Sequence, residues 1–128
     1  MDTSALLPLL DRSDRDHAAV KRAVEALARE GAPLVTASYV LVEAGALSKR
    51  RLGAAAFRAL GDVAARAMRV VWVDEGLHTE AWTRAAKEGR DGPSLVDWVS
   101  FLVMRRIGVE RALALDAHFT RHGFRAIP

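Results

Sequence analysis

Four short apolar runs alternate with longer segments of helical periodicity in this chain, and this alternation constrains the fold more than any other feature. The runs are residues 34–37, 70–73, 112–115 and 124–127. The second run, Val70 to Val73, is β-branched and apolar without alternation, which is typical of strands covered on both faces. Strands that alternate with helices predict an α/β fold with a mainly parallel sheet.

Helices are predicted between the runs, wherever apolar residues recur at helical spacing after a capping residue. Their expected ranges are Ser13 or Asp14 to Gly31, residues 39–51 after Ser38, 54–67, 75–88 after Asp74, and 95–107 after Ser94. No internal repeat, low-complexity tract or linker-like stretch interrupts the chain. Residues 1–128 are therefore predicted to form a single domain.

The composition excludes several other classes of protein. Hydrophobic residues make up 51% of the chain, which excludes disorder over most of its length, and the absence of cysteine excludes a disulfide scaffold. No apolar run approaches the ~20 residues that a membrane-spanning helix needs. No secretory leader opens the sequence, so we expect a cytoplasmic protein without a membrane anchor.

The charge balance permits a polyanionic partner. The net charge is +3 and the isoelectric point is near 9.9, which is compatible with RNA binding. Basic residues cluster at two places, and the candidates for contacts with an RNA backbone are Arg50, Arg51, Arg105 and Arg106. The same residues also fit ordinary solvated helix ends, so charge alone does not decide between the two interpretations.

Glu43 occupies an unusual position for an acidic residue. It falls in the middle of a predicted helix, and its helical neighbours are Tyr39, Val40, Ala46 and Leu47. Because an unpaired carboxylate is costly to bury, the side chain needs a cation, a proton or an exit to water. A functional site, a salt bridge to an arginine and a path to solvent all satisfy this requirement.

Three aspartates lie where predicted helices start. Ser94 and Asp97 fit a capping box, although the helix that follows is apolar nearly all round. Asp116 comes directly after a predicted strand, at the end of a parallel sheet where ligands bind. Asp2 precedes an apolar helical segment. Each aspartate can be a simple cap, line a polar cleft, or do both.

Carboxylates that converge without basic partners repel one another unless a divalent cation neutralises them. Hard oxygen ligands favour Mg²⁺ or Mn²⁺, and such an ion can assist phosphodiester cleavage. Zinc is not expected, because the chain has no cysteine and its four histidines, His17, His78, His118 and His122, show no HExxH spacing. The P-loop, dinucleotide-binding and serine-hydrolase motifs are absent.

Four segments together carry a family resemblance. They are DTSALL (2–7), TASYVLVEAGAL (36–47), SLVDWVSFLVMRRIG (94–108) and ALALDAHFTRHGF (112–124). In these segments the chain resembles the PIN-domain ribonucleases, and most closely the VapC-type toxins of bacterial toxin–antitoxin pairs. The resemblance covers essentially the whole chain in the expected order.

The resemblance implies a three-layer α/β/α sandwich with an acidic pocket at the carboxyl ends of the strands. It implies RNA hydrolysis that depends on Mg²⁺ or Mn²⁺, with catalytic and metal-ligating roles for Asp2, Glu43, Asp97 and Asp116. Ser4 and Ser94 would line the pocket as hydrogen-bond donors. It also implies a small antitoxin that covers the pocket, and a homodimer.

One part of the family pattern differs in this sequence. The family has a short apolar strand directly before the first aspartate, in the middle of the sheet, whereas only Met1 precedes Asp2 here. We expect a missing or truncated first strand, because the sequence starts late, and unpaired backbone groups on the neighbouring strands. We also expect Asp2 to be poorly fixed.

These observations predict a metal-dependent endoribonuclease that is the toxin of an antitoxin pair. One alternative is a non-catalytic PIN-like module that binds RNA or a partner protein and has a disabled site. A second alternative is a small-molecule phosphohydrolase on a similar sheet. Metal-dependent RNA cleavage distinguishes the prediction from both alternatives.

Overall fold

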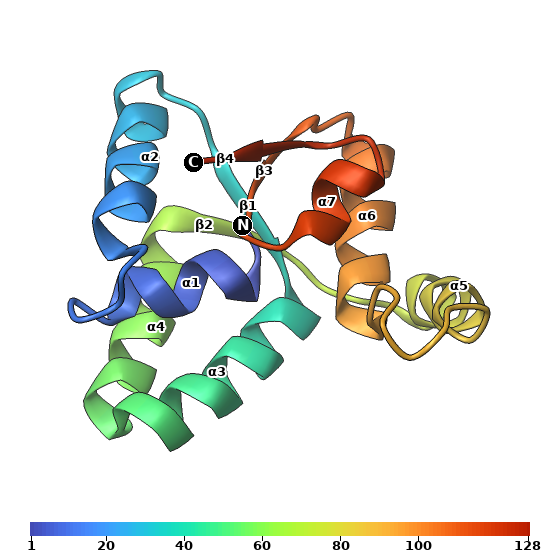
Figure 1. Ribbon diagram of the computed structural model, residues 1–128, viewed down its shortest axis with the longest axis horizontal. Helices are drawn as coiled ribbons and strands as arrows, with labels where there is room; N and C mark the ends of the chain where they lie inside the picture. Colours follow the sequence, from blue (N-terminus) through green and yellow to red (C-terminus); the bar gives the residue numbers. More distant parts are fainter.

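The computed structural model describes residues 1–128 as seven helices and four short strands (Figure 1). The helices are α1 (Thr3–Leu10), α2 (His17–Arg29), α3 (Ser38–Leu52), α4 (Ala54–Ala67), α5 (Glu75–Ala85), α6 (Leu95–Ile107) and α7 (Ala117–Arg121). The strands are β1 (Leu34–Ala37), β2 (Met68–Val71), β3 (Arg111–Leu113) and β4 (Arg125–Ile127). None of the helices has the length and apolar character needed to span a membrane.

The strands form two parallel pairs. Leu34 of β1 lies beside Met68 of β2, and Arg111 of β3 lies beside Arg125 of β4. No strand joins β1 to β3, so the two pairs are not continuous with each other. The predicted α/β class with parallel strands is confirmed.

The first two residues of the chain lie between the two strand pairs, where Figure 1 marks the N-terminus. The Met1 α-ammonium group donates a 2.6 Å hydrogen bond to the carbonyl of Val35 in β1. The backbone N–H of Asp2 donates a 3.0 Å bond to the carbonyl of Leu113 in β3. Met1 and Asp2 therefore bridge β1 to β3 at the place that a central strand would take.

A cleft of about 490 Å³ extends from this bridge between β1 and β3. Its walls include Val35 and Leu113 from the strands and Val103 from α6. The backbone N–H and carbonyl of one strand residue point to the same side. Since Met1 bonds to the carbonyl of Val35, the N–H of Val35 also faces this side. In this structure no strand lies between β1 and β3, and the N–H of Val35 faces the cleft.

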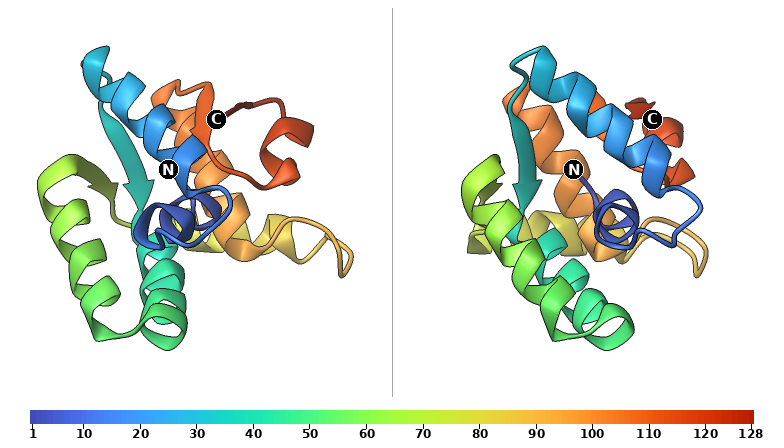
Figure 2. Two further views of the ribbon diagram at one scale, coloured as in Figure 1. Left: turned by 60° about the vertical axis from the view of Figure 1, so that its left-hand side comes forward. Right: turned by 90° about the vertical axis from the view of Figure 1, so that its left-hand side faces the viewer.

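Helices cover both faces of the strands (Figure 2). On one face Leu113 packs against Val20 and Leu27 of α2. On the other face Ala112 and Ala114 belong to the larger core, which includes much of α6. Because successive side chains of a strand point to opposite faces, the apolar segment around β3 needs a helical layer on each side. This arrangement confirms the predicted three-layer sandwich.

Helix α6 is the most deeply buried helix of the fold. Every residue from Asp97 to Val103 is buried, which explains why its sequence is apolar nearly all round. Phe101 is fully buried, and its ring lies 5.1 Å from the Phe119 ring and 5.5 Å from the Phe124 ring, centroid to centroid. The core thus ties α6 to α7 and to the segment that leads into β4.

Most predicted elements are found within three residues of their expected bounds, and strand 70–73 is displaced by two residues toward the N-terminus. The observed strand is Met68–Val71, and Trp72 beyond it is 77% exposed. β2 has β1 as its only neighbour, and an edge strand tolerates a charged residue such as Arg69. Pairing with β1, rather than the apolar run, fixes where this strand lies.

Two predicted helix starts are also wrong. The helix expected to open at Ser13 or Asp14 begins at His17, because Asp14 instead accepts a hydrogen bond from the backbone of Asp16 in a preceding turn. Ser38 is the first residue of α3 rather than its cap. Its hydroxyl accepts a hydrogen bond from the backbone N–H of Val73, which ties the start of α3 to the segment that follows β2.

Two glycine-to-alanine substitutions are expected to change stability in opposite directions. Gly108 ends α6 with φ +68°, where a Cβ is strained, so Gly108→Ala should lower the free energy of unfolding by about 1–2 kcal/mol. Gly61 lies inside α4 with open space around its Cα, so Gly61→Ala should raise that energy by up to about 1 kcal/mol. Urea unfolding measures both changes, and changes of equal sign would contradict the prediction.

Candidate active site

Three aspartates cap the first turns of three different helices. Asp2 accepts a hydrogen bond from the backbone N–H of Ser4 at the start of α1, and Asp116 accepts one from the N–H of His118 at the start of α7. Ser94 and Asp97 form a capping box at the start of α6. The predicted caps are thus confirmed. Because each cap fixes a carboxylate at a helix start, the fold controls where all three carboxylates lie.

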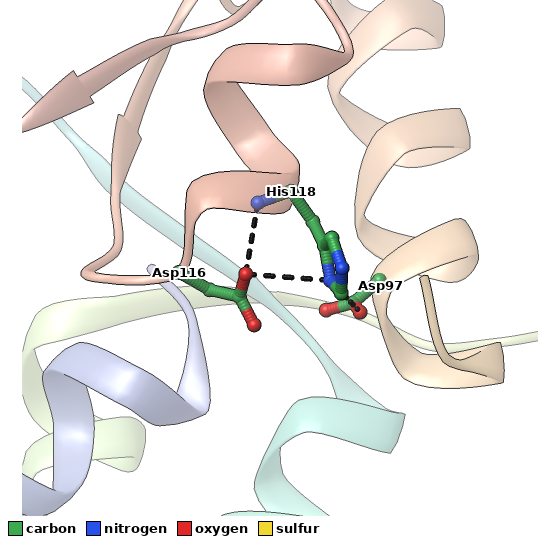
Figure 3. Close-up of side chains that lie close together, drawn as sticks. All are labelled: Asp97, Asp116 and His118. Atoms are coloured by element: carbon green, nitrogen blue, oxygen red, sulfur yellow. Dashed lines mark hydrogen bonds and ion pairs between the residues drawn. The ribbon is translucent and has the colours of Figure 1, made fainter. Parts of the chain in front are cut away.

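Asp97, Asp116 and His118 come together in one cluster (Figure 3). One ligand atom from each residue lies within 4.8 Å of the other two. The Nδ1 atom of His118 is 3.3 Å from Asp97 Oδ2 and 3.3 Å from Asp116 Oδ1. The side chains of Asp97 and His118 are largely buried, whereas that of Asp116 is 39% exposed, so the cluster opens to solvent on the Asp116 side.

Asp2 is firmly held, and the expectation that it would be poorly fixed is wrong. Its Oδ2 atom accepts hydrogen bonds from both the backbone N–H and the hydroxyl of Ser4, at 2.9 and 2.6 Å. The Ser4 hydroxyl in turn accepts a bond from the N–H of Leu115, directly before Asp116. Together with the backbone bond to Leu113, these contacts fix Asp2 through β3 and α1 without a preceding strand.

The negative charges of the site are not balanced by lysine or arginine. No lysine or arginine forms an ion pair with Asp2, Asp97 or Asp116. The pKa of Asp97 is raised above its usual value, mainly because the carboxyl is buried and further because Asp2 and Asp116 repel its charge. Hydrogen bonds from Ser94 and His118 oppose this shift. A nearby cation would relieve the repulsion.

The donor set fits a hard divalent cation. Asp2, Asp97 and Asp116 each use one carboxylate oxygen for capping, and the other oxygen has no hydrogen bond within the chain. Free carboxylate oxygens are the ligands that Mg²⁺ and Mn²⁺ prefer. The serine and backbone bonds to the capping oxygens hold these carboxylates in fixed orientations, as the partners of metal ligands commonly do.

Asp2 lies outside this cluster of close ligand atoms, and so does Glu43. Glu43 lies in the second turn of α3, is half-buried, and makes no hydrogen bond or ion pair within the chain. The salt bridge to an arginine that was one explanation for it is therefore absent. Its role as a ligand stays a prediction.

The basic candidates lie away from the acidic cluster along their helices. Arg50 and Arg51 are exposed in the last turn of α3, and Arg105 and Arg106 are in the last turn of α6, about 12 Å along the axis from Asp97. Arg106 is paired with Glu80 at 2.6 Å. From these positions the arginines can contact a long polyanion, but they do not contact a group that is bound at the acidic cluster.

His118 was not predicted as a site residue, because its spacing to His122 suggested no metal motif. The informative feature of the sequence is instead that His118 follows Asp116 by two residues. The second residue after a helix cap donates its backbone N–H to the cap, which brings its side chain beside the cap carboxylate. A histidine two residues after a capping aspartate therefore indicates such a cluster.

The stability of the metal-free chain is expected to rise between pH 6 and pH 8. Burial lowers the pKa of the Met1 α-ammonium group from 8.0 to about 6, so the unfolded chain binds more protons in this interval. The gain in the free energy of unfolding should be about 2 kcal/mol. Urea unfolding at both pH values measures it. An N-terminally acetylated chain should lose this gain, and an equal gain in both chains would contradict the assignment.

Comparisons with known proteins agree with this geometry. The PIN domain family model matches residues 1–125. The chain is 33% identical over 125 residues to the 23S rRNA-specific endonuclease VapC20 of two Mycobacterium tuberculosis strains, covering 97% of this chain and 93% of each relative. The crystal structure of M. tuberculosis VapC20, described as a sarcin–ricin loop cleaving toxin, matches with a TM-score of 0.83 and 32% identity, covering 96% of this chain and 93% of that one. The predicted resemblance is confirmed, and the chain belongs to the PIN-domain family.

Proposed function

We propose that this protein is a divalent-metal-dependent endoribonuclease and the toxin of a toxin–antitoxin pair. The observation that carries the proposal is the cluster of Asp97 and Asp116, with Asp2 near enough to raise the pKa of Asp97 and no lysine or arginine paired with any of the three. The similarity to VapC20, an endonuclease specific for 23S rRNA, names the substrate class. We also propose that residues 1–128 act as one domain, since the larger core joins residues from Leu6 to Phe124.

The metal ligands that we propose are Asp97 and Asp116, with Asp2 beside them and Glu43 completing the acidic set from α3. The ion is Mg²⁺ or Mn²⁺, and when bound it would stabilise the charge that develops on the phosphoryl oxygens during hydrolysis. The hydroxyl of Ser4 orients the Asp2 carboxylate, and the backbone N–H of Ser94 orients that of Asp97. The three helix N-termini add partial positive charge, which favours a phosphate at this place.

The RNA contacts follow from the charge of the chain. Arg50, Arg51 and Arg105 would bind backbone phosphates at a distance from the scissile bond, through contacts that weaken with salt. Arg106 would contribute less, because Glu80 already pairs with it. A small antitoxin that covers the acidic pocket and a second copy of the chain are the protein partners that we propose. The cytoplasm, where ribosomal RNA is found, is the proposed location.

Cleavage of a defined RNA tests this function. A synthetic stem-loop with the sarcin–ricin sequence is incubated with the full chain and Mg²⁺ or Mn²⁺, with a scrambled loop on the same stem as control. We expect one discrete cut in the native loop, which disappears when EDTA removes the ion. Total cellular RNA serves as a second substrate. Intact RNA in every reaction would contradict the nuclease assignment, and cleavage that survives EDTA would contradict the metal.

A further inference from the structure

The two ring nitrogens of His118 have different surroundings. Nε2 lies 3.2 Å from the backbone carbonyl of Asp91, in the loop between α5 and α6. Nδ1 faces the other way, between the carboxylates of Asp97 and Asp116 (Figure 3). The ring is thus held at both ends, with Nδ1 directed into the acidic pocket.

The contact with Asp91 places a proton on Nε2. A carbonyl oxygen only accepts hydrogen bonds, so Nε2 must be the donor. Nδ1 also faces only acceptors, and an ion bound between the carboxylates would take the place of the proton that Nδ1 shares with Asp97. Metal-bound histidines are commonly oriented in this way, with the nitrogen that does not bind the metal donating to a carbonyl or carboxylate.

The distances also fit coordination of one ion. Neighbouring ligands of an octahedral ion with bonds of about 2.1–2.2 Å lie about 3 Å apart. Nδ1 is 3.3 Å from Asp97 Oδ2 and from Asp116 Oδ1, the oxygens that also accept the capping bonds, so the free oxygen of each carboxylate lies close to the same place.

We propose that Nδ1 of His118 is a direct ligand of the ion held by Asp97 and Asp116, and that it gives the site a preference for Mn²⁺ over Mg²⁺. This inference rests on the proposed metal centre and specifies its ion. Imidazole nitrogen binds transition-metal ions well, whereas Mg²⁺ strongly prefers oxygen. A site with only carboxylates would distinguish the two ions less.

The local sequence fixes this nitrogen in place. The Asp116 carboxylate accepts a hydrogen bond from the backbone N–H of His118. This bond fixes the backbone of the residue that carries the ring. Phe119, the next residue, is 1% exposed and stacks edge-on against Phe101, which anchors α7 to the core. A ligand built on such a rigid segment needs little reorganisation when the ion arrives.

Spectroscopy of the bound ion tests the proposal without an activity measurement. The full chain is freed of metal with EDTA, dialysed and loaded with Mn²⁺, and electron spin echo modulation then detects nitrogen bonded to the ion. We expect the coupling of a directly bound imidazole in the wild-type chain. His118→Gln, which retains an oxygen but no ring nitrogen, should lose it, whereas the control His17→Gln on α2 should keep it.

Affinities supply a second measurement. His118→Gln should weaken Mn²⁺ binding by roughly tenfold or more and Mg²⁺ binding by less than about threefold, as measured by calorimetry. Bound Mn²⁺ without nitrogen coupling, or equal loss of affinity for both ions, would overturn the role of His118 alone. A wild-type chain that binds neither ion would overturn the metal centre and this inference together.

Discussion

Replacing Asp97 by asparagine is expected to reduce RNA cleavage at least about 100-fold while the chain stays folded. Removing a partner of a metal ligand typically costs 10–100-fold, and a direct ligand should cost more. Asparagine can still accept the Ser94 N–H bond, so the capping box of α6 persists. Because the pKa of Asp97 is raised by burial and by Asp2 and Asp116, loss of its charge should increase the stability of the metal-free chain.

The measurement pairs initial cleavage rates with thermal unfolding in EDTA. Asp62→Asn, on the exposed face of α4, is the matched control and should change neither quantity. Activity of Asp97→Asn close to that of the wild type would show that the acidic cluster does not hold the catalytic ion. A lower unfolding temperature in EDTA would show that the carboxylate is structurally stabilising.

Truncation of Phe101 to alanine is expected to have the largest effect on stability, a loss of about 3–5 kcal/mol in the free energy of unfolding. The side chain is fully buried among Trp98, Phe119, His122 and Phe124, and its ring stacks on the His122 ring at 4.5 Å. Since a domain of this kind is stable by about 5–15 kcal/mol, the loss is a large part of the total.

Urea unfolding at constant pH measures this effect. Phe101→Leu keeps more of the apolar volume and should lose less than the alanine variant. Phe57→Ala is the control, because Phe57 is 45% exposed on α4 and should cost less than about 1 kcal/mol. Similar losses for Phe101→Ala and Phe57→Ala would mean that the aromatic cluster does not anchor α6 and α7.

The sequence was most informative where chemistry is local. Asp74, Asp116 and the Ser94–Asp97 box were all identified as helix caps, because the spacing from cap to bonded N–H is short and fixed. Strand β2 was misplaced because its position depends on pairing with β1, and no local residue specifies that register.

The site itself was predicted only in part. Asp97 and Asp116 do lie together, but His118 completes the cluster through a contact with Asp91, whose position depends on a long loop. The firm placement of Asp2 also could not be predicted. It depends on a hydroxyl of Ser4 that reaches Leu115, a contact between residues 111 positions apart.

That long-range contact has a consequence for protein synthesis. The aspartate at the amino end meets its partners only after the segment around Leu115 and Asp116 has been translated and released. At 5–20 residues per second, a ribosome takes roughly 5–20 s to make the intervening chain. The acidic pocket of a nascent polypeptide therefore stays incomplete until this segment has left the ribosome.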